Sequence, residues 1–395
     1  MTQMQQPGEH ALNMHPLLFE AFACSLAMMS FVAVLGPMAR VLGFAPWQAG
    51  AVMTAGGLSL ALFARLWGVC SDRRGRRRIL LLALGGFCVS HLAMSSFAIW
   101  TLEQQNQPVS LAFGGLLALR ALSGLFYAAV PAIGAALIAD HAPAGQRTRL
   151  LAGLGAANAL GLIAGPGLTA LVVGQGLVLS IAASALLPFA ALAVMWRWLP
   201  RYEIRADAQA APALLHDRRL HQPMIVAFVA MTCVGMAQVT VGFFAFDRLQ
   251  LDAAAASRTA GTALTGVGIA LALSQLLLRV IKWPAARWIV AGGLLSAAGF
   301  ASVAWAQSAQ ALWLGYFVAA FGMGWVFPSV AGLAADAVQP GEHGAAAGAV
   351  ATAHGWGMIV GPLLGSLLYG MHAGVPYGVM VLTLLVMAIS ISLNP

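Results

Sequence analysis

Long uninterrupted runs of apolar residues, separated by short polar segments, dominate the sequence. Residues 79–102 and 259–278 contain no Asp, Glu, Lys or Arg, and three other uncharged runs, 150–196, 288–335 and 343–395, are roughly twice as long. A helix of about 20 apolar residues crosses the roughly 30 Å hydrocarbon core of a bilayer. The shorter runs therefore fit one crossing each and the longer runs two. This pattern predicts an all-α polytopic membrane protein.

Short segments containing Gly, Pro, Gln or Ser divide each of the longer runs in two. These segments are 172–176, 306–310 and 371–376. With these divisions, the sequence predicts twelve transmembrane helices, at residues 16–39, 47–69, 79–101, 108–139, 149–172, 176–196, 222–246, 257–280, 287–306, 310–336, 345–370 and 374–393.

A central polar segment, residues 197–221, indicates a cytoplasmic linker between two halves. A tail of residues 1–15 precedes the first bundle (16–196), and the second bundle covers 222–395. The bundles carry matching residues at an offset of 196 or 197: Pro131, Asp140, Pro143, Asn158, Gly161, Gly165 and Pro166 correspond to Pro328, Asp336, Pro340, His354, Gly357, Gly361 and Pro362. Such a match predicts two pseudo-symmetric six-helix repeats.

Charged residues are scarce, and their positions indicate the orientation in the membrane. Only 8% of residues are charged, and the formal net charge is +8. If the helices alternate in direction, fifteen basic loop residues fall on one side and three, Arg40, Arg248 and Arg258, on the other. Lys and Arg are enriched in cytoplasmic loops, so we expect both termini in the cytoplasm of a bacterial inner membrane. The same asymmetry explains the positive charge without a nucleic-acid partner.

Motifs for bound groups and for covalent chemistry are missing from the sequence. The four cysteines have no paired spacing that would indicate a disulfide or a metal site. There is no nucleophile motif, HExxH sequence, P-loop or dinucleotide fingerprint. We therefore expect neither an enzyme nor a cofactor or metal, and an ion gradient rather than ATP as the energy source.

The densest cluster of charge is the segment GVCSDRRGRRR, residues 68–78, between the second and third predicted helices. Its five arginines favour a cytoplasmic position, but that role requires neither Asp72 nor the glycines. Gly68 and Gly75 permit a close helix approach and a tight turn. We expect Asp72 to form a short ion pair among the arginines, with Asp140 at the end of the fourth helix as a second carboxylate.

Three motifs together resemble the major facilitator superfamily. Gly68-x-x-x-Asp72-Arg73-x-Gly75-Arg76-Arg77 resembles its motif A, Leu119-Arg120-x-x-x-Gly124 its motif B, and Gly161-x-x-x-Gly165-Pro166 its motif C, the antiporter signature. With twelve predicted helices, the chain is similar to the drug:proton antiporter group of this superfamily, which implies export. The resemblance also implies a cytoplasmic gate that holds helix ends together in one state and releases them in the other, formed by Gly68, Asp72, Arg73, Gly75, Arg76 and Asp140.

Two ionisable residues inside apolar helices are candidates for proton coupling. Arg120 lies about halfway along an uncharged run, where a charged side chain is costly and faces protein or water; a snorkelling arginine is the alternative. Glu20 is the only carboxylate within the first predicted helix, and some drug:proton antiporters carry an acidic residue at a similar place. A carboxylate whose environment alternates between wet and dry can load a proton on one side and release it on the other. The alternative for Glu20 is an interfacial residue favoured by the helix dipole.

Five polar residues are candidates to line a substrate cavity. Tyr127 shares a helix face with the buried arginine of the fourth helix. Asn158 and His354 occupy matching repeat positions, each seven residues before the Gly of a Gly-Pro pair, and a packing role is an equal alternative for His354. Gln238 and Gln275 lie inside the seventh and eighth predicted helices.

These inferences combine into the hypothesis of a monomeric twelve-helix transporter that works by alternating access. Its expected activity is proton-coupled export, by antiport, of small organic amphipathic molecules such as drugs or a secreted siderophore. Its partners would be protons, membrane lipid and the small-molecule substrate. A proton-coupled uptake symporter of the same fold is the alternative. A non-transporting membrane sensor or scaffold would require a sizeable soluble segment, which the sequence does not show.

Overall fold

The structure of the protein, a computed structural model, describes residues 14–104, 107–141, 146–199, 217–339 and 342–393. Within these ranges the chain is almost entirely helical and contains no strand. The predicted tail and linker lie mostly outside the described residues.

The N-terminal half consists of α1 (Met14–Val41), α2 (Pro46–Arg74), α3 (Arg76–Glu103), α4 (Val109–Tyr127), α5 (Ala129–His141), α6 (Arg147–Val172), η1 (Val173–Gln175) and α7 (Leu177–Trp198). The C-terminal half consists of η2 (Arg218–Leu220), α8 (His221–Phe243), η3 (Phe244–Arg248), α9 (Ala253–Val280), α10 (Ala285–Ala304), α11 (Ala309–Asp336), α12 (His343–Met371) and α13 (Val375–Leu393).

Twelve segments of the described chain are long and apolar enough to cross a membrane. Their number and order confirm the twelve predicted helices. Large apolar side chains such as Val89, Leu186 and Leu382 are exposed, as expected where a helix faces lipid rather than water. The chain is therefore an integral, multi-pass membrane protein.

Helix ends differ from the prediction by up to five residues, and the second, fourth and seventh spans show the physical cause. The fourth span is interrupted: α4 ends at Tyr127 and α5 begins at Ala129, because Pro131 has no N–H to donate to the Tyr127 carbonyl. The second span reaches Arg74 instead of residue 69, since arginines in the last turn of a helix interact favourably with its dipole. The seventh span continues beyond α8 through one π-helical turn to Arg248.

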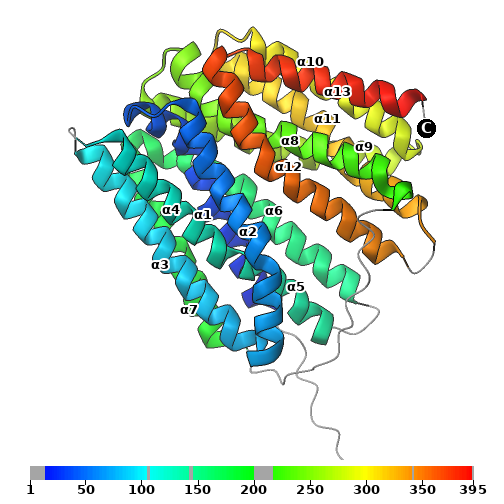
Figure 1. Ribbon diagram of the computed structural model, residues 1–395, viewed down its shortest axis with the longest axis horizontal. Coiled ribbons are helices and arrows are strands. Elements are labelled where there is room, and N and C mark those ends of the chain that lie inside the picture. Colours follow the sequence, from blue (N-terminus) through cyan, green and yellow to red (C-terminus); the bar gives the residue numbers. More distant parts are fainter. Residues whose placement is uncertain (1–13, 105–106, 142–145, 200–216, 340–341, 394–395) are drawn as a thin grey trace, which may run out of the picture.

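The two halves repeat the same packing arrangement. In the N-terminal half α1 packs along α6, and in the C-terminal half α8 packs along α12. Glycines make both contacts: a Cβ on Gly161 or Gly165 would collide with the backbone of α1, and a Cβ on Gly357 or Gly361 with the backbone of α8. Small residues allow helix backbones to approach this closely. The result is two six-helix bundles, coloured blue to green and green to red in Figure 1.

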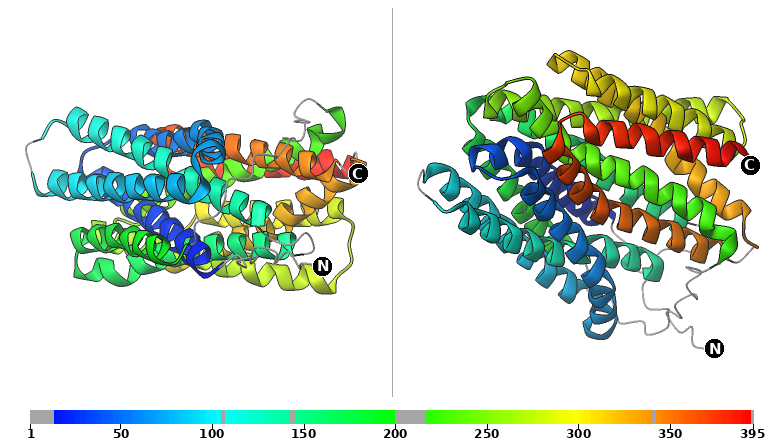
Figure 2. Two further views of the ribbon diagram at one scale, coloured as in Figure 1. Left: turned by 90° about the horizontal axis from the view of Figure 1, so that it is seen from below. Right: turned by 45° about the horizontal axis from the view of Figure 1, so that its top comes forward.

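The halves meet through α2 against α12 and α6 against α9. One of these contacts is a hydrogen bond in which Thr54 Oγ1 donates to the Ile359 carbonyl at 2.9 Å. In Figures 1 and 2, α2 and α12 converge toward one end of the molecule and diverge toward the end where α2 turns into α3. We call the convergent end the Arg40 end, and the divergent end the Arg-rich end, after the arginines of residues 73–78.

Candidate functional site

The turn between α2 and α3 places an arginine between two carboxylates. Gly75 has φ 94°, a backbone conformation that residues with a side chain rarely adopt, so the chain reverses within a single residue. Arg76 pairs with Asp72 of α2, and its Nε donates to Asp140 Oδ2 of α5 at 2.9 Å. The ion pairs expected for Asp72 and Asp140 therefore share one arginine and connect α2, α3 and α5.

Other residues of this turn have different surroundings. Arg77 donates to the carbonyls of Leu199 and Trp196 at the end of α7, both at 2.7 Å. Arg73 is exposed and forms no ion pair with a described residue. A Cβ on Gly68 would meet no atom within 4 Å. The close helix approach expected at Gly68 is therefore absent from this structure, since α12 diverges from α2 here.

Arg219, next to the start of α8, organises a second charged cluster at the Arg-rich end. It pairs with Asp217 at 2.7 Å and with Glu342, just before α12, at 3.1 Å. The Arg219 hydrogen bonds lower the pKa of Asp217, and the Gln339 backbone N–H together with Arg219 lowers the pKa of Glu342. Among the described residues, each ion pair at this end joins residues of the same half.

At the opposite end, one ion pair joins the two halves. Arg40, in the last turn of α1, donates to Asp247 Oδ2 of η3 from Nη2 at 2.6 Å and from Nε at 3.0 Å. The guanidinium also lies 5.1 Å from the centre of the Phe243 ring. Beside this pair α1 and α8 touch, since a Cβ on Gly36 would collide with the backbone of Gly242 and Phe243. These contacts, which the sequence did not reveal, hold the Arg40 end together.

Arg120 lies inside the N-terminal half and is only 5% exposed. Its Nη1 donates to the Met28 sulfur at 3.4 Å, and its guanidinium lies 5.2 Å from the Phe31 ring centre. Among the described residues no carboxylate pairs with it, and its Nε has no acceptor. A sulfur and an aromatic ring therefore surround this charge, which does not snorkel to either end of the bundle.

Glu20 is buried in α1, close to a hydrogen-bonded polar cluster. It is 1% exposed, and its Oε1 accepts no hydrogen bond from a described residue. The cluster joins three helices: the Ser25 and Tyr127 hydroxyls are 3.1 Å apart, and Ser25 donates to Asn158 Oδ1. The structure thus brings two predicted site residues, Tyr127 and Asn158, together at Ser25, which was not predicted because serines are common in these helices. Glu20 lies five residues before Ser25 on the same helix.

The motif C residues form the surface of α6 on which helices of both halves pack. The Gly161 and Gly165 positions contact α1, and Ser30 of α1 donates to the Gly165 carbonyl at 2.9 Å. On the other side, the Pro166 carbonyl faces Gly261 of α9, where a Cβ would collide with it. Motif C therefore lies where α1, α6 and the other half meet.

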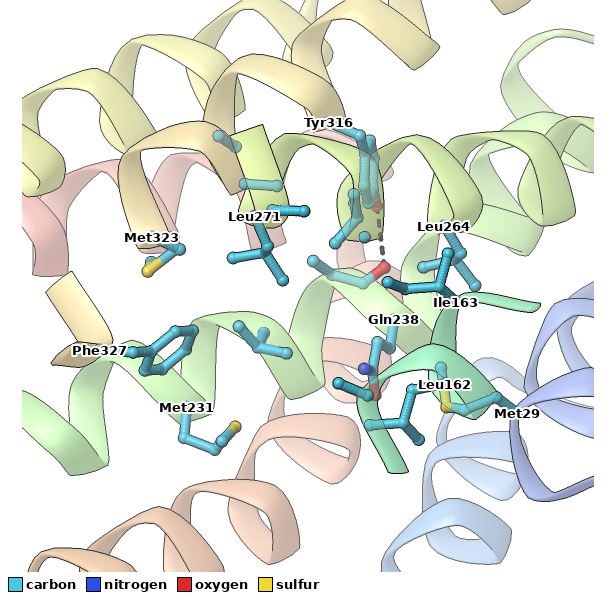
Figure 3. Close-up of a pocket in the computed structure, with 18 of the residues that line it drawn as sticks. Met29, Leu162, Ile163, Met231, Gln238, Leu264, Leu271, Tyr316, Met323 and Phe327 are labelled. Atoms are coloured by element: carbon cyan, nitrogen blue, oxygen red, sulfur yellow. Dashed lines mark hydrogen bonds between the residues drawn. The ribbon is translucent and has the colours of Figure 1, made fainter. Parts of the chain in front are cut away.

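A cavity of about 490 Å³ lies between the two halves. Its walls come from α1 and α6 on one side and from α8, α9, α10, α11 and α12 on the other (Figure 3). Methionine, leucine, phenylalanine and other apolar residues form nearly all of the surface, and Gln238 and Tyr316 supply the polar side chains of the lining.

Of the five predicted cavity residues, Gln238 alone lines this cavity. Its side chain projects from α8 toward Leu162 and Met29 of the N-terminal half (Figure 3). Its Oε1 is buried and has no hydrogen-bond partner among the described residues. Gln238 is therefore an unused polar group at the contact between the halves.

The other candidates lie elsewhere. Tyr127 and Asn158 belong to the polar cluster of the N-terminal half. Gln275 donates instead to the Gly324 carbonyl at 3.0 Å and connects α9 to α11. The His354 ring packs edge-on against Phe327, a residue of the cavity wall, with 5.6 Å between ring centres.

Two related bundles of membrane-spanning helices, with a cavity between them and contacts that join them at one end, define the fold of a secondary transporter. The family profile of the Major Facilitator Superfamily matches residues 17–257 and 227–394. The chain belongs to this superfamily, whose members are transporters and not enzymes.

Individual relatives carry different transport functions. The chain is 25% identical over 342 residues to the tetracycline resistance protein, class B, of Escherichia coli, covering 81% of this chain and 78% of that protein. It is 31% identical over 198 residues to the gallate transporter of Pseudomonas putida, covering 50% of this chain and 40% of that protein.

Solved structures support the same fold. The human organic anion transporter MFSD10 has a TM-score of 0.65 at 19% identity, covering 98% of this chain and all of that one (100%). The nucleoside transporter NupG has a TM-score of 0.76 at 13% identity, covering 96% and 99%. At these identities, the similarity concerns the fold alone.

Proposed function

We propose that this transporter exports small organic amphipathic molecules in exchange for protons. The observation that carries the proposal is Glu20, a buried carboxyl group with one unpartnered oxygen beside the Ser25–Tyr127–Asn158 cluster. A proton on Glu20 changes the charge of an interior that also holds Arg120. Because charge inside a membrane protein is costly unless it is compensated, binding and release of that proton favour different conformations.

The conformational change involves contacts at both ends of the molecule. The positive-inside rule assigns the Arg-rich end to the cytoplasm, so the described state is joined on the outer side and divergent on the inner side. To open outward, the protein must break the Arg40–Asp247 pair. To close inward, α12 must approach α2, and the open space around Gly68 and Asp72 is where it can do so. Contacts of a few kcal/mol are sufficient to favour either of two states.

The direction of transport is supported by two features. The motif C residues Gly161, Gly165 and Pro166 lie at the meeting point of α1, α6 and α9, and one relative is named as a tetracycline resistance protein. We assign the protein to the inner membrane of a bacterium, with both termini in the cytoplasm, and expect it to work as a monomer.

The test is proton movement in liposomes that contain the protein and a pH-sensitive dye. Amphipathic drugs and siderophores are added to the wild type, to Glu20→Gln, and to Glu103→Gln, which removes an exposed carboxylate at the end of α3. We expect substrate-dependent proton movement in the wild type and in Glu103→Gln and none in Glu20→Gln. Equal signals in all three would place the coupling outside Glu20. Co-movement of proton and substrate in the same direction would instead establish uptake by symport.

A further inference from the structure

The lining of the cavity between the halves specifies a chemical class of substrate. We propose that the protein binds an uncharged, lipophilic molecule that carries one hydrogen-bonding group and that Gln238 contacts this group. The inference rests on the proposed transport function and narrows its amphipathic substrates to neutral ones.

The cavity offers no counter-charge to an ionised substrate. No Asp, Glu, Lys, Arg or His is part of the described lining. The buried ionisable residues Glu20, His91 and Arg120 lie in the N-terminal half and outside that lining. Moving an ionised group from water into an apolar environment is strongly unfavourable unless a partner compensates it. A carboxylate, sulfonate or ammonium group in this cavity would have no such partner.

The two polar side chains of the lining differ in whether the protein itself satisfies their hydrogen bonds. The Tyr316 hydroxyl donates to the Ala237 carbonyl at 2.8 Å and lies 3.0 Å from the Tyr377 hydroxyl, so its hydrogen bonds are made within the protein. The Gln238 Oε1, in contrast, has no hydrogen-bond partner among the described residues. An amide can both donate and accept, so Gln238 can bind a hydroxyl, N–H or carbonyl group of a ligand.

The remaining wall suits ligands of varied shape. Four methionines, Met29, Met231, Met323 and Met358, contribute to it together with Phe327. Thioether side chains are flexible and polarisable, and they adapt to irregular apolar surfaces. A volume of about 490 Å³ lies within the range of pockets that hold drug-sized molecules. The cavity therefore selects against charge more strongly than it selects for shape.

A matched pair of fluorescent probes tests this selectivity. N-phenyl-1-naphthylamine and 8-anilinonaphthalene-1-sulfonate share one aromatic frame, and the second adds a sulfonate. Each is titrated into lipid nanodiscs with the wild-type protein, and the signal of empty nanodiscs is subtracted. We expect saturable binding of the neutral probe and no saturable binding of the sulfonate.

Three variants assign this binding to the cavity. Ala159 of α6 and Ala272 of α9 are exposed residues of the opposite walls, so Ala159→Trp and Ala272→Trp fill the cavity without entering a packed core. We expect each to abolish binding of the neutral probe. Gln238→Leu should weaken that binding roughly threefold to tenfold, because it removes one hydrogen bond. The control ligand is N-methyl-N-phenyl-1-naphthylamine, the neutral probe with a methyl group on its nitrogen and no N–H to donate. Gln238→Leu should not change the affinity for this ligand.

Two results would overturn the proposal: equal affinities for both probes, or neutral-probe binding that survives both tryptophan variants. The assay needs neither a proton gradient nor transport, so its outcome is separable from that of the liposome experiment. Neutral-probe binding without proton movement would support the substrate class and reject proton-coupled export. Proton movement driven only by charged drugs would support proton-coupled transport and reject the neutral substrate class.

Discussion

The two halves share a packing scaffold but hold different residues in their interiors. At the repeat offset of 196, Arg120 corresponds to Tyr316 and Tyr127 to Met323. In the N-terminal half these positions hold a buried guanidinium and a tyrosine hydroxyl that is hydrogen-bonded to Ser25. In the C-terminal half the same positions are part of an apolar cavity wall.

We propose that this difference reflects a division of labour between the repeats. The glycines and prolines that bring α6 to α1 and α12 to α8 occur in both halves, because both bundles need the same close backbone contact. Interior positions do not have to be small for this contact, so they can differ between the halves. In this proposal, ionisable groups of the N-terminal half take up the proton, while the substrate meets an uncharged cavity wall that comes mostly from the C-terminal half.

The largest effect is expected from replacing the buried charge in the N-terminal half by an apolar side chain. Arg120→Met removes a buried charge that has no carboxylate partner among the described residues. Replacing buried charges by apolar residues of similar size is often neutral or stabilising by roughly 1–4 kcal/mol. We therefore expect Tm in detergent to stay level or rise, while substrate-dependent proton movement falls to background.

The matched control is Tyr316→Phe in the other repeat. It loses the hydrogen bond to the Ala237 carbonyl, at a cost of about 1 kcal/mol, and should keep transport. A drop in Tm for Arg120→Met with coupling retained would show that Arg120 has a structural role, and the contrast between the halves would then fail.

An intermediate effect is expected where the halves join. The Arg40–Asp247 pair is half-buried and carries two charge-assisted hydrogen bonds, so Asp247→Asn should favour opening of the Arg40 end by about 2 kcal/mol, or roughly 30-fold. Spin labels at the exposed positions Trp47 of α2 and Met371 of α12 report the distance between the halves, in a background with Cys70 replaced.

Two controls decide whether the ion pair causes this opening. Exchanging the charges, Arg40→Asp with Asp247→Arg, should restore the short distance, and Asp252→Asn, an exposed carboxylate nearby, should not change it. An unchanged distance distribution in Asp247→Asn would show that the backbone contact of α1 with α8 is sufficient to hold this end.

The smallest effect on stability is expected at the Arg-rich end. Asp72 is half-exposed and pairs with Arg76 of its own half, and such surface pairs contribute about 0–1 kcal/mol. Asp72→Asn should therefore leave Tm nearly unchanged, yet slow transport several-fold, because in the proposed gate α2 closes against α12 near this residue. Glu342→Gln, which removes a comparable exposed partner of Arg219, should affect neither Tm nor transport. Normal transport by Asp72→Asn would contradict the proposed gate.

The span architecture was predictable because it depends on local composition. A run of about 20 uncharged residues has few alternatives to a membrane helix, and turn residues show where the double runs divide. The break between α4 and α5 was missed, because Pro residues occur inside other helices of this chain, such as Pro37 and Pro188, without ending them. Whether a proline interrupts a helix depends on its neighbours in space.

The candidate site was less predictable because it depends on how each helix is rotated about its axis and on contacts between residues that are far apart in the sequence. Arg40 and Asp247 are 207 positions apart, and neither has a local pattern that indicates the other. Gln238 and Gln275 look alike in sequence, but only Gln238 faces the cavity, while Gln275 faces α11. That Glu20 and Arg120 lie inside the protein was predictable, because an ionisable residue within a long apolar helix is rare and avoids lipid.

The most direct test of the division of labour is substrate counterflow in liposomes, measured with no proton gradient and then with one imposed. The substrate is the compound that drives proton movement in the wild type, and the variant is Glu20→Gln. We expect Glu20→Gln to exchange substrate at the wild-type rate but to lose uphill transport driven by the gradient. Loss of exchange as well, or retention of uphill transport, would contradict the assignment of the proton to Glu20 and of the substrate to the separate cavity between the halves.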